Sequence, residues 1–151
     1  MTSDIVIRLG TQEDITQISK LWLQMVNELR PGLKPNVSWW QTMCRNFMDA
    51  TNLYTVIVAL DKSTIIGFVD GFIFPEPATG KAHGVAQHFF ILPEYRKTNI
   101  AQRLYLQILK LAKQKKASCV EFFCFSDNKE FWLKKNYKEM RIMMRKELHY
   151  V

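Results

Sequence analysis

A basic loop in the second half of the sequence has the residue types best suited to bind an anion. In "ILPEYRKTNIAQRLY" an apolar run ends at Pro93, and a helical pattern starts near Ile100. A loop between a strand and a helix gathers backbone N–H groups at the positive end of the helix dipole, which favours a phosphate. No glycine lies between these two residues, so other residues must shape the turn. The sequence therefore predicts an anion site with an unusual backbone.

Three ionisable side chains within apolar segments are candidates for proton transfer. Asp70 alternates with apolar residues in "FVDGF", so it is either a buried functional carboxylate or a charge on an edge strand. His83 and His88 belong to a second apolar segment, and histidine exchanges protons near neutral pH. Each histidine is also explained as a hydrogen-bonded structural residue. In a regular strand the two histidines face opposite sides of the sheet.

Charge is unevenly distributed along the 151 residues, whose net charge is +7. Residues 1–95 contain seven basic and nine acidic residues, whereas residues 96–151 contain fourteen basic and five acidic residues. The asymmetry indicates that the second half meets an anion such as nucleic acid, a membrane surface or a phosphorylated cofactor, or that solvated lysines keep the protein in solution. The sequence lacks the Arg/aromatic interleaving of a nucleic-acid-binding domain, so a nucleic-acid partner is not expected.

Hydropathy and cysteine content predict a cytoplasmic protein without a membrane partner. No apolar run is long enough to span a bilayer, and the N-terminal stretch "MTSDIVIRLG" has an acidic residue where a secretion signal needs basic ones. Cys44, Cys119 and Cys124 lack CxxC spacing, so we expect three buried thiols in a reducing compartment and no metal site.

The hydrophobic pattern predicts one α/β domain over residues 1–151. Alternation of apolar and polar residues indicates strands, and spacings of three and four residues indicate helices. Thr11 followed by Asp14 is a weak form of the capping box at the start of the first helix. The predicted elements are a strand at 5–10, helices at 11–29 and 38–50, a strand hairpin at 53–74, a strand at 85–92, a helix at 100–116, a strand at 119–125, a short helix at 127–136 and a strand at 137–148. Their order is β-α-α-β-β-β-α-β-α-β around a mixed central sheet.

This order and the segment "FFILPEYRKTNIAQRLY" resemble the GNAT family of acetyl-CoA-dependent N-acetyltransferases, over residues 5–148. The segment is similar to the family's cofactor signature, Arg or Gln-x-x-Gly-x-Gly/Ala. Arg96 holds the first position and Ala101 the last, while Asn99 stands where the family has its most regular glycine. Asparagine adopts the left-handed backbone region at a cost of about 1 kcal/mol. We therefore expect Asn99 to turn the loop and cofactor binding to be weakened but retained.

The resemblance implies which residues hold acetyl-CoA. The backbone of the strand before the loop would pair with the pantetheine arm, N–H groups of the loop would hold the pyrophosphate, and Arg side chains would contact phosphates. Asn128 begins the second family signature and is implied either to touch the pantetheine arm or only to cap its helix. The implied cofactor-binding residues are Phe89, Phe90, Ile91, Arg96, Lys97, Thr98, Asn99, Ile100, Ala101, Arg103 and Asn128.

The resemblance also implies catalytic positions, two of which depart from the family. Gln87 occupies the place of a glutamate base, and an amide orients water but takes no proton. The catalytic candidates are therefore Gln87, His88 and Asp70. Trp132 stands where a tyrosine protonates the leaving thiolate, and indole supplies no proton at neutral pH. Since a thiol has a pKa near 8.5, its thiolate can leave unassisted.

The resemblance implies an acceptor site for a primary amine between the first two helices and the loop before residue 85. The candidate substrate-binding residues are Glu28, Trp39, Trp40 and His83. The two indoles are explained either as the wall of a pocket or as core residues of a helix. The predicted function is acetyl transfer to this amine, of a small molecule or a peptide. The alternative is a weak or inactive domain that senses acetyl-CoA or binds a protein, and a homodimer is possible by resemblance.

Overall fold

The computed structural model describes residues 4–50, 53–124, 129–140 and 146. Its strands form one sheet in the order β1-β2-β3-β4-β5, and all neighbours are antiparallel except β4 and β5, which are parallel. The strands are β1 (Ile5–Leu9), β2 (Tyr54–Asp61), β3 (Thr64–Pro75), β4 (Ala82–Ile91) and β5 (Cys119–Phe122). The helices are α1 (Ile15–Leu29), α2 (Val37–Ala50), α3 (Ile100–Gln114) and α4 (Lys129–Leu133), with 3-10 turns at Gln12–Asp14 and Pro93–Tyr95.

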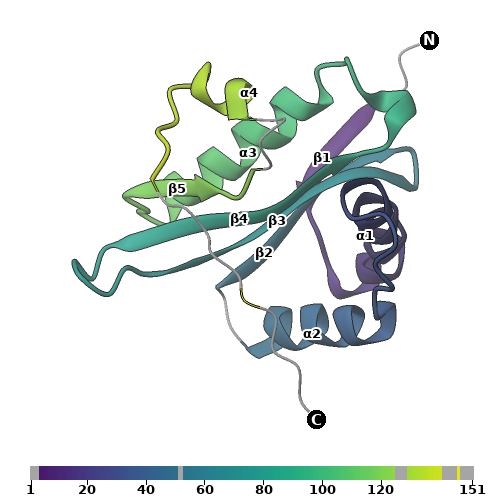
Figure 1. Ribbon diagram of the computed structural model, residues 1–151, viewed down its shortest axis with the longest axis horizontal. Helices are drawn as coiled ribbons and strands as arrows, with labels where there is room; N and C mark the ends of the chain where they lie inside the picture. Colours follow the sequence, from purple (N-terminus) through teal and green to yellow (C-terminus); the bar gives the residue numbers. More distant parts are fainter. Residues whose placement is uncertain (1–3, 51–52, 125–128, 141–145, 147–151) are drawn as a thin grey trace.

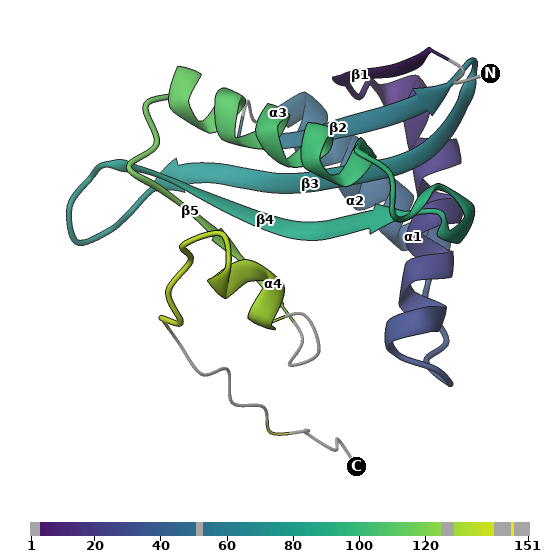
Figure 2. The same cartoon turned by 90° about the horizontal axis from the view of Figure 1, so that it is seen from above.

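The sheet forms the middle layer of the molecule. Helices α1 and α2 cover one face, and α3 lies on the other face with α4 beside it (Figures 1 and 2). Strands β2 and β3 are almost continuously apolar and buried because helices cover both of their faces. Two hydrophobic clusters result, one between the sheet and α1/α2 and one between the sheet and α3.

The helical spacing seen in the sequence selects the residues that face the sheet. Ile15, Ile18 and Met25 of α1 are buried as that spacing predicts, whereas Leu29 at the end of the helix is 43% exposed. On α3, Ile100 and Leu104 are buried against the opposite face of the sheet. Burial of these apolar stripes is what fixes the two helices on the sheet.

The start of α1 is fixed by a buried carboxylate. The Asp14 side chain accepts a hydrogen bond from the Thr11 backbone N–H at 2.8 Å, so the predicted capping pair is confirmed. Both Asp14 oxygens also accept hydrogen bonds from the Arg8 guanidinium, at 2.6 and 2.9 Å. This ion pair therefore joins β1 to the helix that follows it.

A β-bulge interrupts the pairing of β3 with β4. Asp70 pairs with His88, but the next residue, Gly71, pairs with Ala86, so Gln87 is an extra residue on β4. A Cβ atom at Gly71 would lie 2.3 Å from the Val85 carbonyl oxygen, so only glycine fits at this close approach.

The bulge changes which face of the sheet each half of β4 presents. Ala86 packs in the cluster on the α3 side, whereas Phe90, four residues later, packs in the cluster on the α1/α2 side. In a regular strand these two residues would share a face. The bulge therefore places His83 and His88, which are five residues apart, on the same face.

The single α/β domain with a mixed sheet is as predicted, with differences at element ends. Strand β4 begins at Ala82, three residues earlier than predicted, and β5 ends at Phe122, because residues 123–124 are irregular. Residues 137–140 of the last predicted strand are irregular, and 141–145 and 147–148 lie outside the described residues. Cys44 is buried but Cys119 and Cys124 are exposed, so the expectation of three buried thiols is wrong. No helix in the described ranges is long and apolar enough to cross a membrane.

Candidate active site

Strands β4 and β5 pair over only part of the length of β4. Residues 83–86 pair with residues 119–122, and β4 then continues to Ile91 while β5 has ended. Residues 87–91 therefore have no strand partner on the β5 side within the part of the chain that the structure describes. An unpaired strand edge presents backbone N–H and C=O groups to which an extended amide-containing molecule can bind. The backbone of Phe89, Phe90 and Ile91 lies along this edge.

The anion loop joins the end of β4 to α3, and its turn is made by Lys97. Lys97 has φ 63°, in the left-handed region, whereas Asn99 has φ −79° and ψ 0°. The expectation that Asn99 turns the loop is therefore wrong. The left-handed turn falls two residues earlier, directly after the extended backbone of Arg96, so Asn99 can enter the helix with ordinary angles.

The N-terminus of α3 is suited to hold an anion. Asn99 occupies the N-cap position without a side-chain capping bond, and the Arg103 N–H donates to the Asn99 carbonyl at 3.0 Å. The N–H groups before Arg103 precede this helical bond, and such groups have no partner within a helix. Thr98 Oγ1 donates to the Tyr95 carbonyl at 2.7 Å and lies 3.4 Å from the Ile100 nitrogen. The backbone N–H groups at this end of the helix, including that of Ala101, form a short cradle of donors, whereas the Thr98 hydroxyl is already engaged with the Tyr95 carbonyl.

The two arginines expected to contact phosphates bind protein groups instead. Arg96 donates through Nε to the Ile91 carbonyl at 2.9 Å and through one terminal nitrogen to both Glu28 oxygens, at 2.8 and 3.1 Å. Arg103 donates to the Ile5 carbonyl at 2.8 Å. Arg96 therefore attaches the loop to α1, and Arg103 attaches α3 to β1.

Two lysines add positive charge at the loop. Lys97 is exposed at the turn itself. Lys135 donates to the Gln102 side chain at 2.9 Å and lies 4.7 Å from the centre of the Tyr105 ring. Because Gln102 belongs to the first turn of α3, Lys135 adds a second cation beside the helix N-terminus.

Two of the catalytic candidates lie in contact beside the bulge. His88 Nδ1 lies 2.9 Å from Asp70 Oδ1 and 3.1 Å from Oδ2, and the His88 backbone N–H also donates to Oδ1 at 2.9 Å. The Asp70 side chain is 1% exposed and that of His88 is 26% exposed. Gln87, the third candidate, is exposed at the bulge.

The Asp70 carboxylate continues into a buried chain of hydrogen bonds. Tyr54 Oη donates to Asp70 Oδ2 at 2.6 Å, and Cys44 Sγ lies 3.5 Å from the same hydroxyl. Burial, followed by the charge of Asp70, raises the pKa of Tyr54 far above its ordinary value. Burial likewise raises the pKa of Cys44 to about 11. Both groups are therefore neutral at neutral pH.

The pKa of His88 reflects two opposing effects. Burial lowers the pKa, but the charge of Asp70 and its hydrogen bond to the ring outweigh burial, so the net direction is upward from 6.5. A histidine with this environment is a stronger base than a free imidazole.

An aromatic cluster lies beside the open edge of β4. Trp132 of α4 stacks on Phe122 with ring centroids 4.2 Å apart, and it meets Phe89 of β4 edge-on at 6.4 Å. Tyr137 also contacts Trp132, and burial raises the pKa of Tyr137 above its ordinary value, so neither ring is a ready proton donor. Asn128, predicted as a cofactor contact, lies outside the described residues.

The four predicted substrate-binding residues are not brought together. Trp40 is buried and stacks on Trp22 with centroids 4.9 Å apart, whereas Trp39 is 61% exposed at the start of α2. His83 is buried, with its ring 5.3 Å from that of Phe74, its Nδ1 3.6 Å from Cys119 Sγ and its Nε2 3.3 Å from a Glu121 oxygen. The sequence left open whether the indoles wall a pocket or fill the core, and in the structure Trp40 fills the core while Trp39 is exposed to solvent.

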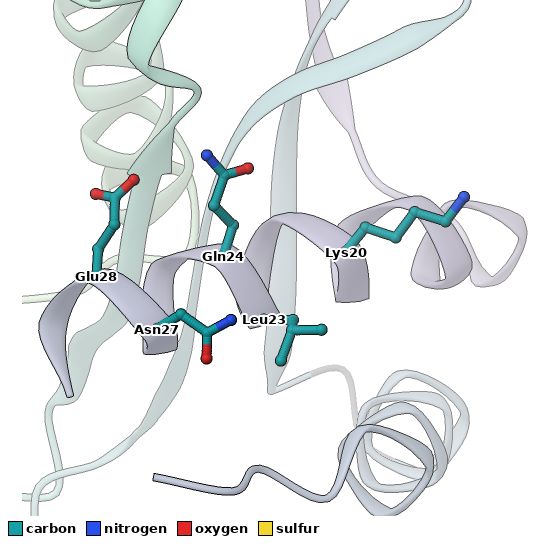
Figure 3. Close-up of a pocket in the computed structure, with 5 residues that line it drawn as sticks. All are labelled: Lys20, Leu23, Gln24, Asn27 and Glu28. Atoms are coloured by element: carbon teal, nitrogen blue, oxygen red, sulfur yellow. The ribbon is translucent and has the colours of Figure 1, made fainter. Parts of the chain in front are cut away.

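A surface depression lies along α1, beside the contact between Glu28 and Arg96. It is open to solvent and lined by one helix, with Glu28 at its end nearest the loop (Figure 3). A depression on a single helix encloses no ligand, so Glu28 contributes to the site through Arg96. The lining residues are Lys20, Leu23, Gln24, Asn27 and Glu28.

Comparison with known proteins agrees with this geometry. A profile of the Acetyltransferase (GNAT) family matches residues 18–134. A possible acetyltransferase from Clostridium difficile 630 superposes with a TM-score of 0.80 at 14% identity, covering 97% of this chain and 99% of that one. A Trypanosoma brucei acetyltransferase gives 0.76 at 17% identity, with 96% and 100% covered. Glucosamine-6-phosphate N-acetyltransferase from Arabidopsis thaliana gives 0.74 at 14% identity, with 96% and 99% covered.

A comparison with curated protein sequences finds no significant match. The structural similarities, at these low identities, establish the fold. The family profile spans well over half of the sequence and includes β4, the anion loop and α3. The chain therefore belongs to the GNAT family of acetyltransferases.

Proposed function

We propose that the protein transfers the acetyl group of acetyl-CoA to a primary amine by direct attack in a ternary complex. The main support for the proposal is that the open edge of β4 leads through the loop directly to the N-terminus of α3, so that backbone donors of both lie next to each other. Members of the family use acetyl-CoA, and its extended amide arm and its pyrophosphate require these two kinds of donor in this order.

The residues of this edge and loop divide the work of holding acetyl-CoA. Backbone groups of residues 87–91 bind the pantetheine arm, and N–H groups of residues 97–101 bind the pyrophosphate. Lys97 and Lys135 add positive charge beside the phosphates. Arg96 acts indirectly, since its contacts with Glu28 and the Ile91 carbonyl hold the loop in place.

The acceptor is an amine of a small molecule or a peptide. Proteins of similar structure include aminoglycoside, glucosamine-6-phosphate and ribosomal-protein-alanine acetyltransferases, so the fold accommodates acceptors of very different size. On the α1/α2 face, an acceptor meets the exposed edge of His88 directly beside the open part of β4.

Calorimetric titration with acetyl-CoA and with 3′-dephospho-coenzyme A tests the cofactor site. We expect micromolar binding of acetyl-CoA that weakens without the 3′-phosphate. Lys97→Ala should weaken binding further, because it removes a charge at the helix N-terminus. Lys62→Ala is the matched control, since Lys62 is also an exposed lysine with positive φ, at 56°, but lies in the β2–β3 turn. Equal effects of the two variants, or no binding at all, would contradict the proposal.

The alternative function is a weak or inactive domain that senses acetyl-CoA or binds a protein. It is favoured by Gln87 and Trp132, which stand where the family resemblance calls for a base and an acid. A panel of glucosamine 6-phosphate, kanamycin and a peptide with an N-terminal alanine, followed by release of free thiol from acetyl-CoA, separates the two functions. Tight binding without thiol release on any amine would favour the sensor.

A further inference from the structure

The contact between His88 and Asp70 pairs a partly exposed imidazole with a fully buried carboxylate. The imidazole approaches through Nδ1, which lies within hydrogen-bond distance of both Asp70 oxygens. A carboxylate that receives the Nδ1–H fixes the ring tautomer and leaves the lone pair on Nε2. Within the described residues, no hydrogen bond to Nε2 of His88 is found, and a quarter of the side chain is exposed.

The Asp70 carboxylate is held rigidly by donors from three directions. The His88 ring, the His88 backbone N–H and the Tyr54 hydroxyl all direct hydrogens at it, at 2.6 to 3.1 Å. The backbone bond exists because of the bulge, which frees the His88 N–H from the regular ladder opposite Asp70. A buried carboxylate with this many donors keeps one position, and it keeps the attached ring in one orientation.

We propose that His88 is the general base of the acetyl transfer, acting through Nε2, and that Asp70, held by Tyr54, is its positioning residue. The inference rests on the proposed function, since it needs an amine and acetyl-CoA at the open edge of β4. Asp70 is not itself the base, because a side chain 1% exposed offers no surface to an amine. Gln87 is exposed at the bulge but carries an amide, which cannot accept the proton.

The proton and electron balance of the step is simple. Nε2 takes one proton from the ammonium form of the acceptor, and the freed nitrogen lone pair attacks the acetyl carbonyl carbon. The new C–N bond forms, the C–S bond breaks, and its electron pair stays on sulfur. The second proton lost by the nitrogen ends on the thiolate, and the imidazolium gives its proton to solvent. The products are the amide, free coenzyme A and one proton.

The groups around the pair support a base that works near neutral pH. Asp70 faces His88 from β3, Tyr54 contacts Asp70 from β2, and Cys44 contacts Tyr54 from α2. Arg45 acts on Cys44 from the same helix. Tyr54 and Cys44 stay neutral, so Asp70 supplies the negative charge that offsets burial of the imidazole, and the net shift of the His88 pKa is upward. A base whose pKa lies near the working pH is unprotonated in a large share of molecules and still basic enough to accept the proton.

The kinetic test measures thiol release from acetyl-CoA, with the fastest amine of the panel above, between pH 5.5 and 9. We expect the wild-type kcat/KM to rise through a pKa above 6.5. His88→Gln should lower kcat by about 10²-fold or more, with unchanged acetyl-CoA affinity in the calorimeter. Asp70→Asn should move the midpoint to lower pH. Tyr54→Phe should move it to higher pH without abolishing turnover, because Asp70 loses a hydrogen-bond donor and presents more negative charge to His88.

The matched control is Asp14→Asn, which removes the charge of the other buried aspartate and leaves the pH midpoint unchanged. A second readout needs no activity, because the imidazole of His88 can be titrated by NMR in the wild type and in Asp70→Asn. A wild-type pKa at or below 6.5, or one that Asp70→Asn does not lower, would overturn the inference even if the enzyme is active.

The outcomes separate this inference from the proposed function. Turnover that His88→Gln leaves intact overturns the base role alone and leaves acetyl transfer standing. Acetyl-CoA binding with no turnover on any amine overturns both. Loss of turnover in His88→Gln with intact acetyl-CoA binding, together with the lowered midpoint in Asp70→Asn, is the result that we expect.

Discussion

Among the residues that the structure describes, two buried aspartates have different partners. Asp14 is bound by the Arg8 guanidinium and the Thr11 N–H, while Asp70 is bound by the His88 imidazole and the Tyr54 hydroxyl. A guanidinium never loses its charge near neutral pH, so the first pair is permanent. An imidazole does lose its charge, so the second pair can exchange a proton. The partner therefore separates a structural carboxylate from a functional one, although both are buried.

The largest expected effect comes from removing the bulge that brings His88 to Asp70. Gly71→Ala would place a methyl group against the Val85 carbonyl, so β3 and β4 must move apart. We expect a loss of about 3 kcal/mol in the free energy of unfolding, as for a severely overpacked site, measured by urea denaturation. Gly84→Ala is the control, since its added Cβ would meet Val120 at an ordinary 3.4 Å. Equal stability of the two variants would show that the close approach is absent.

The next effect concerns the structural aspartate. Asp14→Ala should lower stability by about 2 kcal/mol, because the Arg8 and Thr11 donors lose their acceptor. The Arg8 hydrogen bond, aided by the Thr11 N–H and opposed by burial, lowers the pKa of Asp14 below 3.8. This contribution is therefore present above the unfolded pKa and is lost as pH falls through the folded pKa. Urea titrations between pH 2 and 6 should show a flatter acid limb for the variant, and parallel limbs would contradict the assignment.

The pair of His88 with Asp70 should contribute less to stability than Asp14 does, and its contribution should depend on pH in the opposite direction. Although burial lowers the pKa of His88, Asp70 raises it to a value above 6.5, so the pair stabilises the fold fully below the unfolded pKa. The contribution is lost as pH rises through the folded pKa. Thermal unfolding of the wild type from pH 6 to pH 9 should therefore show a decline that His88→Gln lacks. A decline of the same size in His88→Gln would mean that another group is responsible.

The smallest effect is expected at an exposed carboxylate. Glu139 pairs with Lys129, but their side chains are 57% and 47% exposed. Glu139→Gln should change stability by less than about 0.5 kcal/mol, because water and salt screen such a pair. Denaturation at low and high salt measures this stability change. A loss of stability as large as that of Asp14→Ala would show that a carboxylate need not be buried to stabilise the fold.

The elements could be predicted from the sequence because each depends on local patterns. The apolar stripe of α1, the alternation in β1 and the capping pair Thr11–Asp14 are all visible within a few residues. The bulge is not visible in the sequence, because it depends on how β3 pairs with β4, and the apolar pattern of β4 does not show which of its residues lacks a partner. Since the bulge moves one half of β4 to the other face, the expectation that His83 and His88 face opposite sides is wrong, and the contact of His88 with Asp70 is not visible in the pattern.

The candidate site was predicted in its location but not in its contacts. The anion loop could be found from the family signature, whereas the Arg96–Glu28 ion pair joins residues far apart in the chain that carry no shared signal. Tyr54 was missed as well, since a tyrosine in an apolar strand reads as packing until its hydroxyl is seen to donate to Asp70. The turn at Lys97 was assigned to Asn99 because residue type favours asparagine there, but chain geometry placed the turn earlier.

The positions of the indoles give the protein its own optical labels. Trp22 and Trp40 are stacked together between α1 and α2, whereas Trp132 lies on Phe122 and meets Phe89 at the open edge of β4. Ultraviolet excitation therefore samples the stacked pair between the helices and the indole at the edge, together with the exposed Trp39 of α2. The edge indole gives a fluorescence signal local to that strand, with no dye attached.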